Sequence, residues 1–289
     1  MRTVGTQVRG IRAPIIKQGD DLVQIVVDSL LQAAKKEGFI LNDRDVLEAA
    51  KNENFELRDK DVIGITESLV ARAQGNYVTL EVVSKDLKNK FGAEEIGVVF
   101  PLISRNRFSL ILKAIAQSFL RVYLLLSYPS DEVGNSLMDI DRMEEAGINP
   151  YTDFLTEEDY RRIFGEEVKH PFTGVDYVQT YKDLGIDGNI SIYFSNNPRD
   201  ILRFTRNVLT ADIHSRERTK RILKESGALK LYGLDDICTE VIAGSGYNRD
   251  YGLLGSNVAT EEKLKLFPRD GQFYVDEIQK KIKELTGKQ

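Results

Sequence analysis

The amino-acid sequence predicts a mixed α/β fold of the α+β type, with mixed sheets and flanking helices. Short apolar runs rich in branched side chains, such as residues 122–127, have the composition of buried strands. Other segments, such as residues 22–33, repeat apolar residues at the spacing of a helix. Residues 207–226 have the pattern of a strand followed at once by a helix. We therefore expect a single domain, residues 1–289, with two lobes that share one site.

Composition excludes several classes of protein. The chain is 42% hydrophobic, which is enough for a substantial core. Its net charge is −5 and charges of both signs are interspersed, so we expect no nucleic-acid partner and no membrane partner. The single cysteine, Cys238, excludes an internal disulfide and a cysteine-based metal site. The longest apolar run, near residues 122–126, is too short to span a bilayer, and no secretory signal is visible. These features indicate a soluble cytoplasmic protein.

The N-terminal part is predicted to hold a first anion-binding segment. In chain order we expect a strand with a turn over 3–16, a helix from Leu22 that Asp20 or Asp21 caps, a strand region over 54–65, and a short helix over 66–76. A junction between a strand and a helix exposes backbone amides, so Thr66, Glu67 and Ser68 are placed to hold a phosphate. An ordinary capped helix is the alternative. Arg72, in the same helix, is a further candidate for phosphate binding.

A second polar segment follows the predicted strand 122–127. Before it we expect a helix over 78–89, a strand over 97–100 and a helix over 109–119. The strand ends in a polar loop, residues 127–135, and ligands of α/β proteins collect beyond the carboxyl ends of strands. Asp131 and Glu132 are therefore candidate metal ligands, and Asn135 is placed at either the metal or a nucleotide.

Residues 136–186 are more polar than the segments around them. They contain glycine and proline and a capping-box start at Thr156. We interpret them as an excursion from the core that serves as a lid or a dimer arm.

The densest group of charged and titratable side chains lies in residues 195–219. We expect strands over 187–194 and 207–211 and helices over 198–204 and 217–226, so this group precedes a helix. Asp212 can bind a hard divalent cation, and Arg216 and Arg218 can each grip a phosphate or carboxylate in a bidentate manner. His214 either packs or acts as an acid or base. A surface cluster of salt bridges at a helix start is the alternative.

The C-terminal part begins with a glycine-rich stretch over 242–257. Its four glycines suit a backbone that approaches a ligand closely, and Arg249 lies among them. A long hairpin loop is the alternative. A strand and turn over 264–272 and an amphipathic helix over 275–285 complete the predicted elements.

Two of these segments carry a resemblance to a known family. Residues 61–75 (DVIGITESLVARAQG) and 210–216 (TADIHSR) resemble two signatures of the coenzyme F420-0:L-glutamate ligase family. The chain departs from those signatures at Glu67 and Ser68, at Ile213 and His214, and at Ser215. The resemblance implies a mixed fold like that of these ligases, a homodimer, and an enzyme that joins L-glutamate to a deazaflavin precursor through an amide bond, with GTP and divalent metal ions. In that signature the aspartate is a metal ligand, which implies the same role for Asp212.

We therefore predict a γ-glutamyl ligase that uses GTP or ATP with Mg²⁺ or Mn²⁺ and forms an acyl phosphate of an F420-0-like or folate-like acceptor. The predicted catalytic residues are Asp212, His214 and Arg216; the predicted nucleotide or phosphate contacts are Thr66, Glu67, Ser68, Arg72, Arg218 and Arg249; and the predicted metal ligands are Asp131, Glu132 and Asp212. One alternative is a metal- and nucleotide-binding protein of the same fold without ligase activity. Another is a phosphate-handling enzyme that uses His214 as an acid or base.

Overall fold

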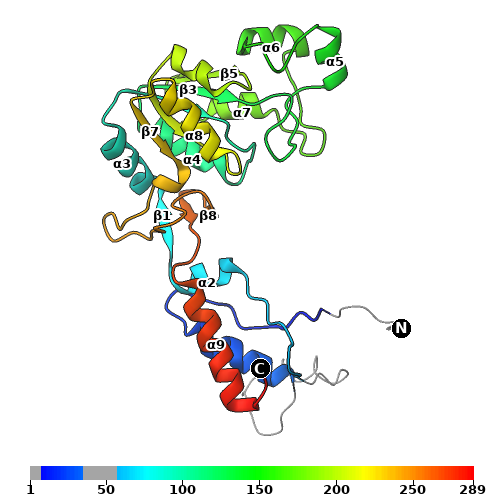
Figure 1. The fold of residues 1–289 in the computed structure, drawn as a ribbon, viewed down its shortest axis with the longest axis vertical. Helices are drawn as coiled ribbons and strands as arrows, with labels where there is room; N and C mark the ends of the chain where they lie inside the picture. The colour runs from blue at the N-terminus through cyan, green and yellow to red at the C-terminus, as the bar shows by residue number, and fades with distance from the viewer. Residues whose placement is uncertain (1–7, 35–56) are drawn as a thin grey trace. The chain divides into compact units, whose positions relative to one another are not determined.

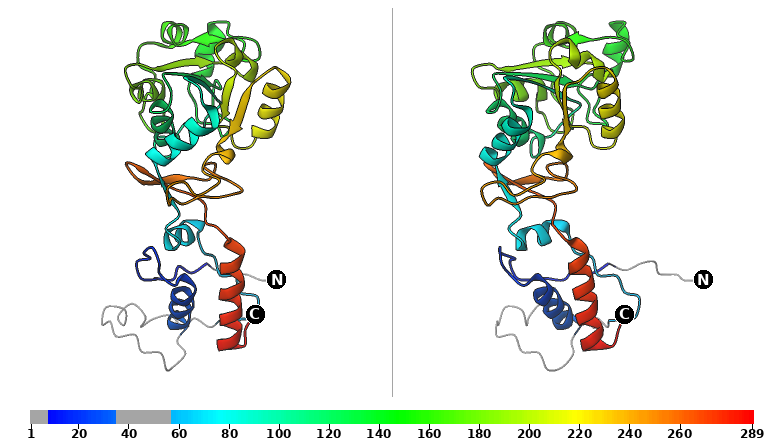
Figure 2. Two further views of the ribbon diagram at one scale, coloured as in Figure 1. Left: turned by 90° about the vertical axis from the view of Figure 1, so that its left-hand side faces the viewer. Right: turned by 60° about the vertical axis from the view of Figure 1, so that its left-hand side comes forward.

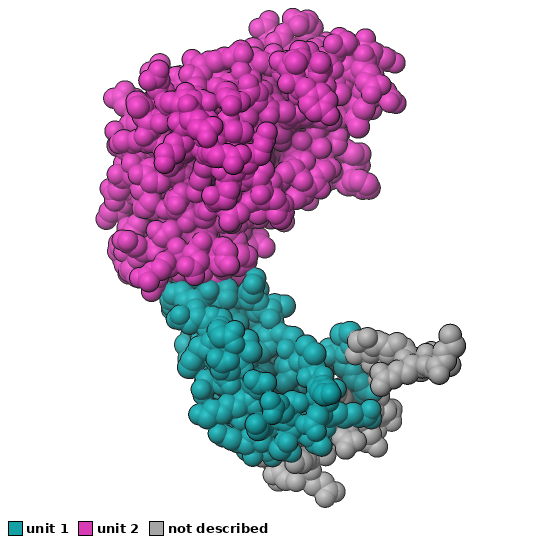
Figure 3. All heavy atoms as spheres, viewed as in Figure 1, with its two compact units in different colours: residues 1–76, 268–289 teal, residues 77–267 magenta. Residues whose placement is uncertain are grey.

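The chain folds into two compact units. The computed structural model describes residues 8–34 and 57–289, and the predictions for residues 3–7 and 54–56 lie outside these ranges. Unit 1 is Met1–Asn76 with Pro268–Gln289, and unit 2 is Tyr77–Phe267 (Figure 3). Both ends of unit 2 therefore connect to unit 1.

Unit 1 contains three helices, α1 (Leu22–Ala33), α2 (Glu67–Ala73) and α9 (Gly271–Thr286), in its described part (Figure 1). The predicted cap of the first helix is confirmed, because the Asp21 carboxylate accepts a hydrogen bond from the Gln24 amide at 2.9 Å. Val27 and Leu30 of α1 pack with Ile278 and Ile282 of α9. The two longest helices of the unit thus bury a common apolar seam.

The strands predicted over 3–16 and 54–65 are wrong for the described residues, which form no strand there. The apolar run at 62–65 was taken for a strand entering a core, but Val62 is 94% exposed. An apolar run becomes a strand only where a neighbouring backbone completes its hydrogen bonds. All strands of the described chain belong to unit 2.

The main sheet of unit 2 has six strands in the order β4-β5-β3-β2-β6-β7. Their bounds are β2 (Glu95–Val99), β3 (Arg121–Leu126), β4 (Leu155–Thr156), β5 (Ile190–Phe194), β6 (Asn207–Thr210) and β7 (Lys230–Gly233). The five strands from β5 to β7 run parallel, and β4 pairs antiparallel with β5 at the edge. The predicted mixed α/β fold is confirmed, and the predicted strands at 97–100, 122–127, 187–194 and 207–211 all lie in this sheet.

A second, antiparallel sheet has the order β1-β9-β8, with β1 (Tyr77–Thr79), β8 (Asn257–Thr260) and β9 (Lys263–Lys265). It pairs the start of unit 2 with its end. Leu264 and Leu266 from this region are buried in the same core as α3 (Leu80–Phe91). The small sheet therefore belongs to the core of unit 2.

Helices cover both faces of the main sheet. Side chains alternate along each strand, so Val98 of β2 joins a core with α3 and α4 (Phe108–Ala116), whereas Val99 joins a core with η1 (Pro198–Arg203) and α8 (Arg216–Glu225). In Figure 2 the teal helix α3 and the yellow helix α8 lie on opposite sides of the sheet. The result is a three-layer arrangement whose central strands are buried on both faces.

Gly97 of β2 is required by the packing of η1 on the sheet. A methyl group at this position would lie 2.4 Å from Cγ1 of Ile201 and 3.2 Å from Cγ2 of Thr205. We expect Gly97→Ala to lower the free energy of unfolding by about 1–3 kcal/mol, the usual cost of overpacking. Chemical denaturation measures this loss. Gly271→Ala is the matched control, since the space around that position is open, and its free energy of unfolding should be unchanged or higher. If Gly97→Ala were as stable as the native chain, the close packing of Ile201 on Gly97 would be contradicted.

The polar segment 136–186 is anchored on the sheet. It contains α5 (Ile140–Glu145), β4, α6 (Glu157–Phe164) and α7 (Tyr177–Asp183). The Thr156 capping box is confirmed at the start of α6. Tyr160 is fully buried and stacks on Phe194 of β5 with ring centroids 4.6 Å apart. The segment therefore contributes to the core, and a role as a lid or dimer arm stays a prediction.

Candidate functional site

The candidate site lies between β2 and β6 of the main sheet, where the order of the strands reverses. β2 leads through α4 to β3 on one side, whereas β6, the other neighbour of β2, leads through α8 to β7 on the opposite side. In parallel sheets with this order, ligands bind beyond the carboxyl ends of the two strands at this switch point. Thr210 ends β6, and Asp212 follows it two residues later, so the predicted stretch 195–219 supplies this position.

Asp212 is a buried carboxylate that is only half satisfied. Its Oδ2 atom accepts hydrogen bonds from the hydroxyls of Ser215 at 2.7 Å and Thr219 at 2.6 Å. Its Oδ1 atom is buried and has no hydrogen-bond partner within the described part of the chain, and the same holds for Oγ1 of Thr210. Burial raises the pKa of Asp212, the two hydroxyls oppose this, and the charge of Glu132 raises it further. A buried oxygen of this kind is a candidate contact for a bound ion, water or ligand.

Glu132 approaches Asp212 from the loop after β3. Its carboxylate accepts hydrogen bonds from the amides of Ile213, His214 and Ser215, and from the Ser215 hydroxyl at 3.0 Å. These amides precede α8, so Glu132 occupies the N-terminus of that helix. Burial alone would raise the pKa of Glu132, but the hydrogen bonds from the amides and the hydroxyl hold it below its usual value. The Ser215 hydroxyl touches both carboxylates, so the structure brings Glu132 and Asp212 together.

Asp131 shapes the same loop. Its Oδ1 atom accepts from the amides of Val133 and Asn135, and its Oδ2 atom accepts from the Ile103 amide at 2.9 Å and the Asn135 side chain at 2.7 Å. Ile103 lies after β2, so Asp131 ties together the segments that follow two adjacent strands. Each of its oxygens already accepts two hydrogen bonds. A role for Asp131 or Asn135 at a metal stays a prediction.

The donors present fit a hard cation of the Mg²⁺ type. Among residues 8–34 and 57–289, no group of three or more His, Cys, Asp or Glu side chains could enclose a metal ion. Mg²⁺ does not need such a cage, because it keeps several waters and is commonly bound through one or two carboxylates and the phosphates of a substrate. The unpartnered oxygens of Asp212 and Thr210 are of the required kind. The fit therefore rests on these two residues.

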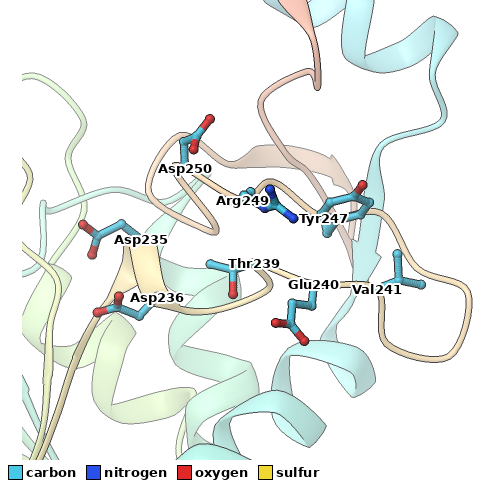
Figure 4. A pocket seen from close by; sticks show the side chains of 8 residues that line it. All are labelled: Asp235, Asp236, Thr239, Glu240, Val241, Tyr247, Arg249 and Asp250. Carbon is cyan, nitrogen blue, oxygen red and sulfur yellow. The ribbon is translucent and has the colours of Figure 1, made fainter.

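Arg216 connects this site to a polar cavity. Its Nε atom donates to Oδ2 of Asp235 at 2.9 Å, and its Nη1 atom donates to the Ile213 carbonyl. Asp235 lines a cavity of about 520 Å³ together with Asp236, Thr239, Glu240, Val241, Tyr247, Arg249 and Asp250 (Figure 4). The predicted glycine-rich stretch thus supplies Arg249, whose side chain lies between the aspartates and Val241 in the view of Figure 4.

The side chains of the other predicted residues are exposed. His214 enters the network through its backbone amide, and His214 and Arg218 are exposed at the start of α8. Thr66 precedes α2 in unit 1, with Glu67, Ser68 and Arg72 in the helix, and all four are exposed. Since no strand precedes α2 in the described chain, the strand-to-helix junction expected there is wrong. Thr66, Glu67, Ser68 and Arg72 thus belong to unit 1, whereas Asp212 belongs to unit 2.

Three hydroxyl-bearing residues close to Asp212 in the sequence were not among the predicted site residues. Ser215 and Thr219 bind its Oδ2 atom, and Thr210 ends the strand before it. Positions 215 and 219 are four residues apart, the spacing that places two side chains on one face of a helix. That spacing, directly after an aspartate that follows a strand, was the signal available in the sequence.

The fold is that of an α/β protein, and its candidate site lies at the switch point of the five parallel strands. A family model described as F420-0:Gamma-glutamyl ligase matches residues 10–289. The chain therefore belongs to the F420-0:γ-glutamyl ligase family, whose members are ligases. No curated protein and no solved structure matches the chain. Within the described residues, no helix is long and apolar enough to cross a membrane.

Proposed function

We propose that this protein forms an amide bond between the amine of L-glutamate and a carboxylate of an F420-0-like or folate-like acceptor, using GTP or ATP with Mg²⁺ or Mn²⁺. The observation that carries the proposal is the buried, half-satisfied carboxylate of Asp212 at the switch point, next to the N-terminus of α8. Membership of the ligase family supplies the reaction class. We further propose that the enzyme acts in the cytoplasm as a homodimer.

The proposed reaction has two steps, because direct condensation of a carboxylate with an amine is unfavourable in water. First, an oxygen of the acceptor carboxylate attacks the terminal phosphorus of the nucleotide, and the nucleoside diphosphate leaves with the bridging oxygen. Second, the glutamate amine attacks the acyl carbon. The C–N bond forms, the bond from carbon to the phosphate oxygen breaks, inorganic phosphate leaves, and the amine loses a proton to the surroundings. Both steps depend on holding the reacting groups in line.

Asp212 and Thr210 would hold the cation through their unpartnered oxygens. When bound, the cation supplies positive charge that offsets the negative charge of the phosphate groups. The Ser215 and Thr219 hydroxyls fix the orientation of the Asp212 carboxylate by binding its other oxygen. Arg218, exposed on the first turn of α8, is free of the core and is proposed to contact phosphate. Arg216 is held by Asp235 and positions the start of α8.

The cavity of Figure 4 is the proposed site for glutamate. Arg249 is exposed in its lining and can bind a carboxylate of the amino acid. The carboxylates of Glu240 and Asp250 line the same cavity and can attract its ammonium group. Asp235, shared between this cavity and Arg216, places the cavity beside α8.

The direct test is a search for the amide product. The purified protein is incubated with glutamate, GTP or ATP, Mg²⁺ or Mn²⁺, and either an F420-0-like or a folate-like acceptor, and the products are analysed by mass spectrometry. We expect one acceptor to gain a glutamyl residue only when nucleotide and metal ion are both present. Nucleotide binding without turnover with any acceptor would favour a non-catalytic binding protein of the same fold.

Arg249 tests the assignment of the cavity. We expect Arg249→Met to raise the KM for glutamate by about tenfold or more with little change in kcat. The reason is that the variant loses a charge-assisted hydrogen bond to glutamate that is equally strong in the substrate complex and in the transition state. Arg206→Met is the matched control, since Arg206 is exposed and precedes β6 at the amino-terminal end of the strands, whereas the cavity follows the carboxyl-terminal end of β7. Steady-state kinetics measure both constants. An unchanged KM for glutamate would place the amino acid elsewhere.

A further inference from the structure

The N-terminus of α8 already holds an anion. Three successive amides, from Ile213 to Ser215, and the Ser215 hydroxyl converge on the carboxylate of Glu132. Glu132 belongs to the loop after β3, so this contact joins two segments that are far apart in sequence. A helix N-terminus with several free amides is a site that favours phosphate as well as carboxylate.

The side chain of Glu132 is exposed, and the loop that carries it is held by contacts of its neighbour Asp131. The Asp131 carboxylate fixes the backbone of the loop through its bonds with Ile103, Val133 and Asn135. The side chain of Glu132 is on the exposed side of this anchor, next to Val133, which is 53% exposed. In the described part of the chain, no Lys or Arg forms an ion pair with Glu132. The amides and one hydroxyl are thus what holds it.

A second observation points to a ligand at the same place. Oδ1 of Asp212 is buried and without a partner among the described residues, and the other oxygen of this carboxylate binds the Ser215 hydroxyl that also contacts Glu132. A cation on Asp212 would thus lie beside the group that occupies the amides. Phosphate bound through amides and a cation together is a common arrangement at parallel sheets.

We propose that Glu132 is a built-in occupant of a phosphate site, and that a phosphate group displaces its carboxylate from the amides of residues 213–215 and from the Ser215 hydroxyl. The inference rests on the proposed function in one respect, that the natural source of the phosphate is a nucleotide. It assigns Glu132 a role different from that of a metal ligand. While no phosphate is bound, the Glu132 carboxylate accepts the hydrogen bonds of the amides at the N-terminus of α8. An incoming phosphate competes with it for these amides.

If Glu132 competes with phosphate, Glu132→Gln should strengthen phosphate binding; if Glu132 is a metal ligand, the same substitution should weaken it. Removing the charge of a competitor raises the fraction of chains whose site is ready to bind, and the apparent affinity rises in proportion. We expect the variant to bind inorganic pyrophosphate about tenfold more tightly than the native chain in the presence of Mg²⁺. Glu217→Gln is the matched control, because it removes the same charge from the first turn of α8 without touching the amides; its affinity should change less than about twofold.

Titration calorimetry of the full-length chain with pyrophosphate, GTP and ATP measures these affinities. A larger gain for GTP or ATP than for pyrophosphate would identify the nucleotide as the source of the phosphate, and an equal gain would identify free phosphate groups as sufficient. The melting temperature of each variant with and without pyrophosphate shows that it is folded, and Glu132→Gln should show the larger rise on binding. Unchanged or weaker binding by Glu132→Gln would overturn the proposal.

The experiment separates this proposal from the ligase function. Binding of pyrophosphate requires neither glutamate nor an acceptor. Tighter binding by Glu132→Gln without any amide product would support the phosphate site and count against the ligase reaction. Amide formation combined with weaker binding by Glu132→Gln would support the ligase and overturn the built-in occupant.

Discussion

Asp212→Asn is expected to lower kcat/KM for glutamate incorporation by about a hundredfold to a thousandfold, the range seen when one preorganised electrostatic contact to the reacting groups is removed. Asparagine retains the shape of the side chain and can still bind the Ser215 and Thr219 hydroxyls, but it lacks the charge that holds a cation. The loss should appear in steady-state kinetics at saturating Mg²⁺.

The stability of the same variant should not fall. Burial raises the pKa of Asp212, so the charged form is disfavoured in the folded protein and a neutral side chain is tolerated there. Asp187→Asn is the matched control: Asp187 is exposed, precedes β5 at the amino-terminal end of the parallel strands, and has a positive φ that asparagine also adopts. Full activity of Asp212→Asn would remove Asp212 from the site.

Arg161→Met is expected to destabilise unit 2 by about 3–5 kcal/mol, the usual cost of breaking a buried ion pair. Arg161 of α6 binds Asp176 through both terminal nitrogens, at 2.6 Å and 3.2 Å, and the two side chains are 11% and 9% exposed. The substitution leaves the Asp176 charge buried and unpaired. Urea denaturation measures the loss, and Arg162→Met, from an exposed pair one residue away, should cost no more than about 1 kcal/mol.

The pH dependence of the free energy of unfolding is a second test of the ion pair between Arg161 and Asp176. Burial opposes ionisation, but the hydrogen bonds from Arg161 and from the amides of Gln179 and Val168 hold the pKa of Asp176 below its usual value. A carboxyl whose pKa is lowered by folding stabilises the protein above its unfolded pKa, and this stabilisation is lost as the pH falls through the folded pKa. The loss of stability between neutral and acidic pH should therefore be smaller in Arg161→Met than in the native chain.

The double variant Arg161→Met/Asp176→Asn should recover part of the stability that Arg161→Met loses. A loss equal to the sum of the two single losses would contradict the pairing.

The sequence predicted the structure correctly where that structure depends on residues close together in the chain. The strand at 122–127, the Asp21 cap and the Thr156 capping box depend on residues within a few positions of each other, and all are present. Asp212 was located correctly between a strand and a helix for the same reason.

Predictions that depend on distant partners succeeded less often. The apolar run at 62–65 resembles a strand locally, but no neighbouring strand is available to it among the described residues. The contact between Glu132 and the amides before α8 follows from the order of β3, β2 and β6 in the sheet, which no single segment encodes. The saturated hydrogen bonds of Asp131 were likewise hidden, because one of their donors, Ile103, comes from another loop.

Transfer of a heavy oxygen isotope shows whether the acceptor carboxylate is phosphorylated before it is joined to glutamate. The acceptor is prepared with the isotope in its carboxylate, the reaction is run with GTP or ATP, and the released inorganic phosphate is analysed by mass spectrometry. We predict that one isotopic oxygen from the acceptor appears in the phosphate for each amide bond formed, since the bond from carbon to the phosphate oxygen breaks in the second step. Amide product accompanied by unlabelled phosphate would contradict this account.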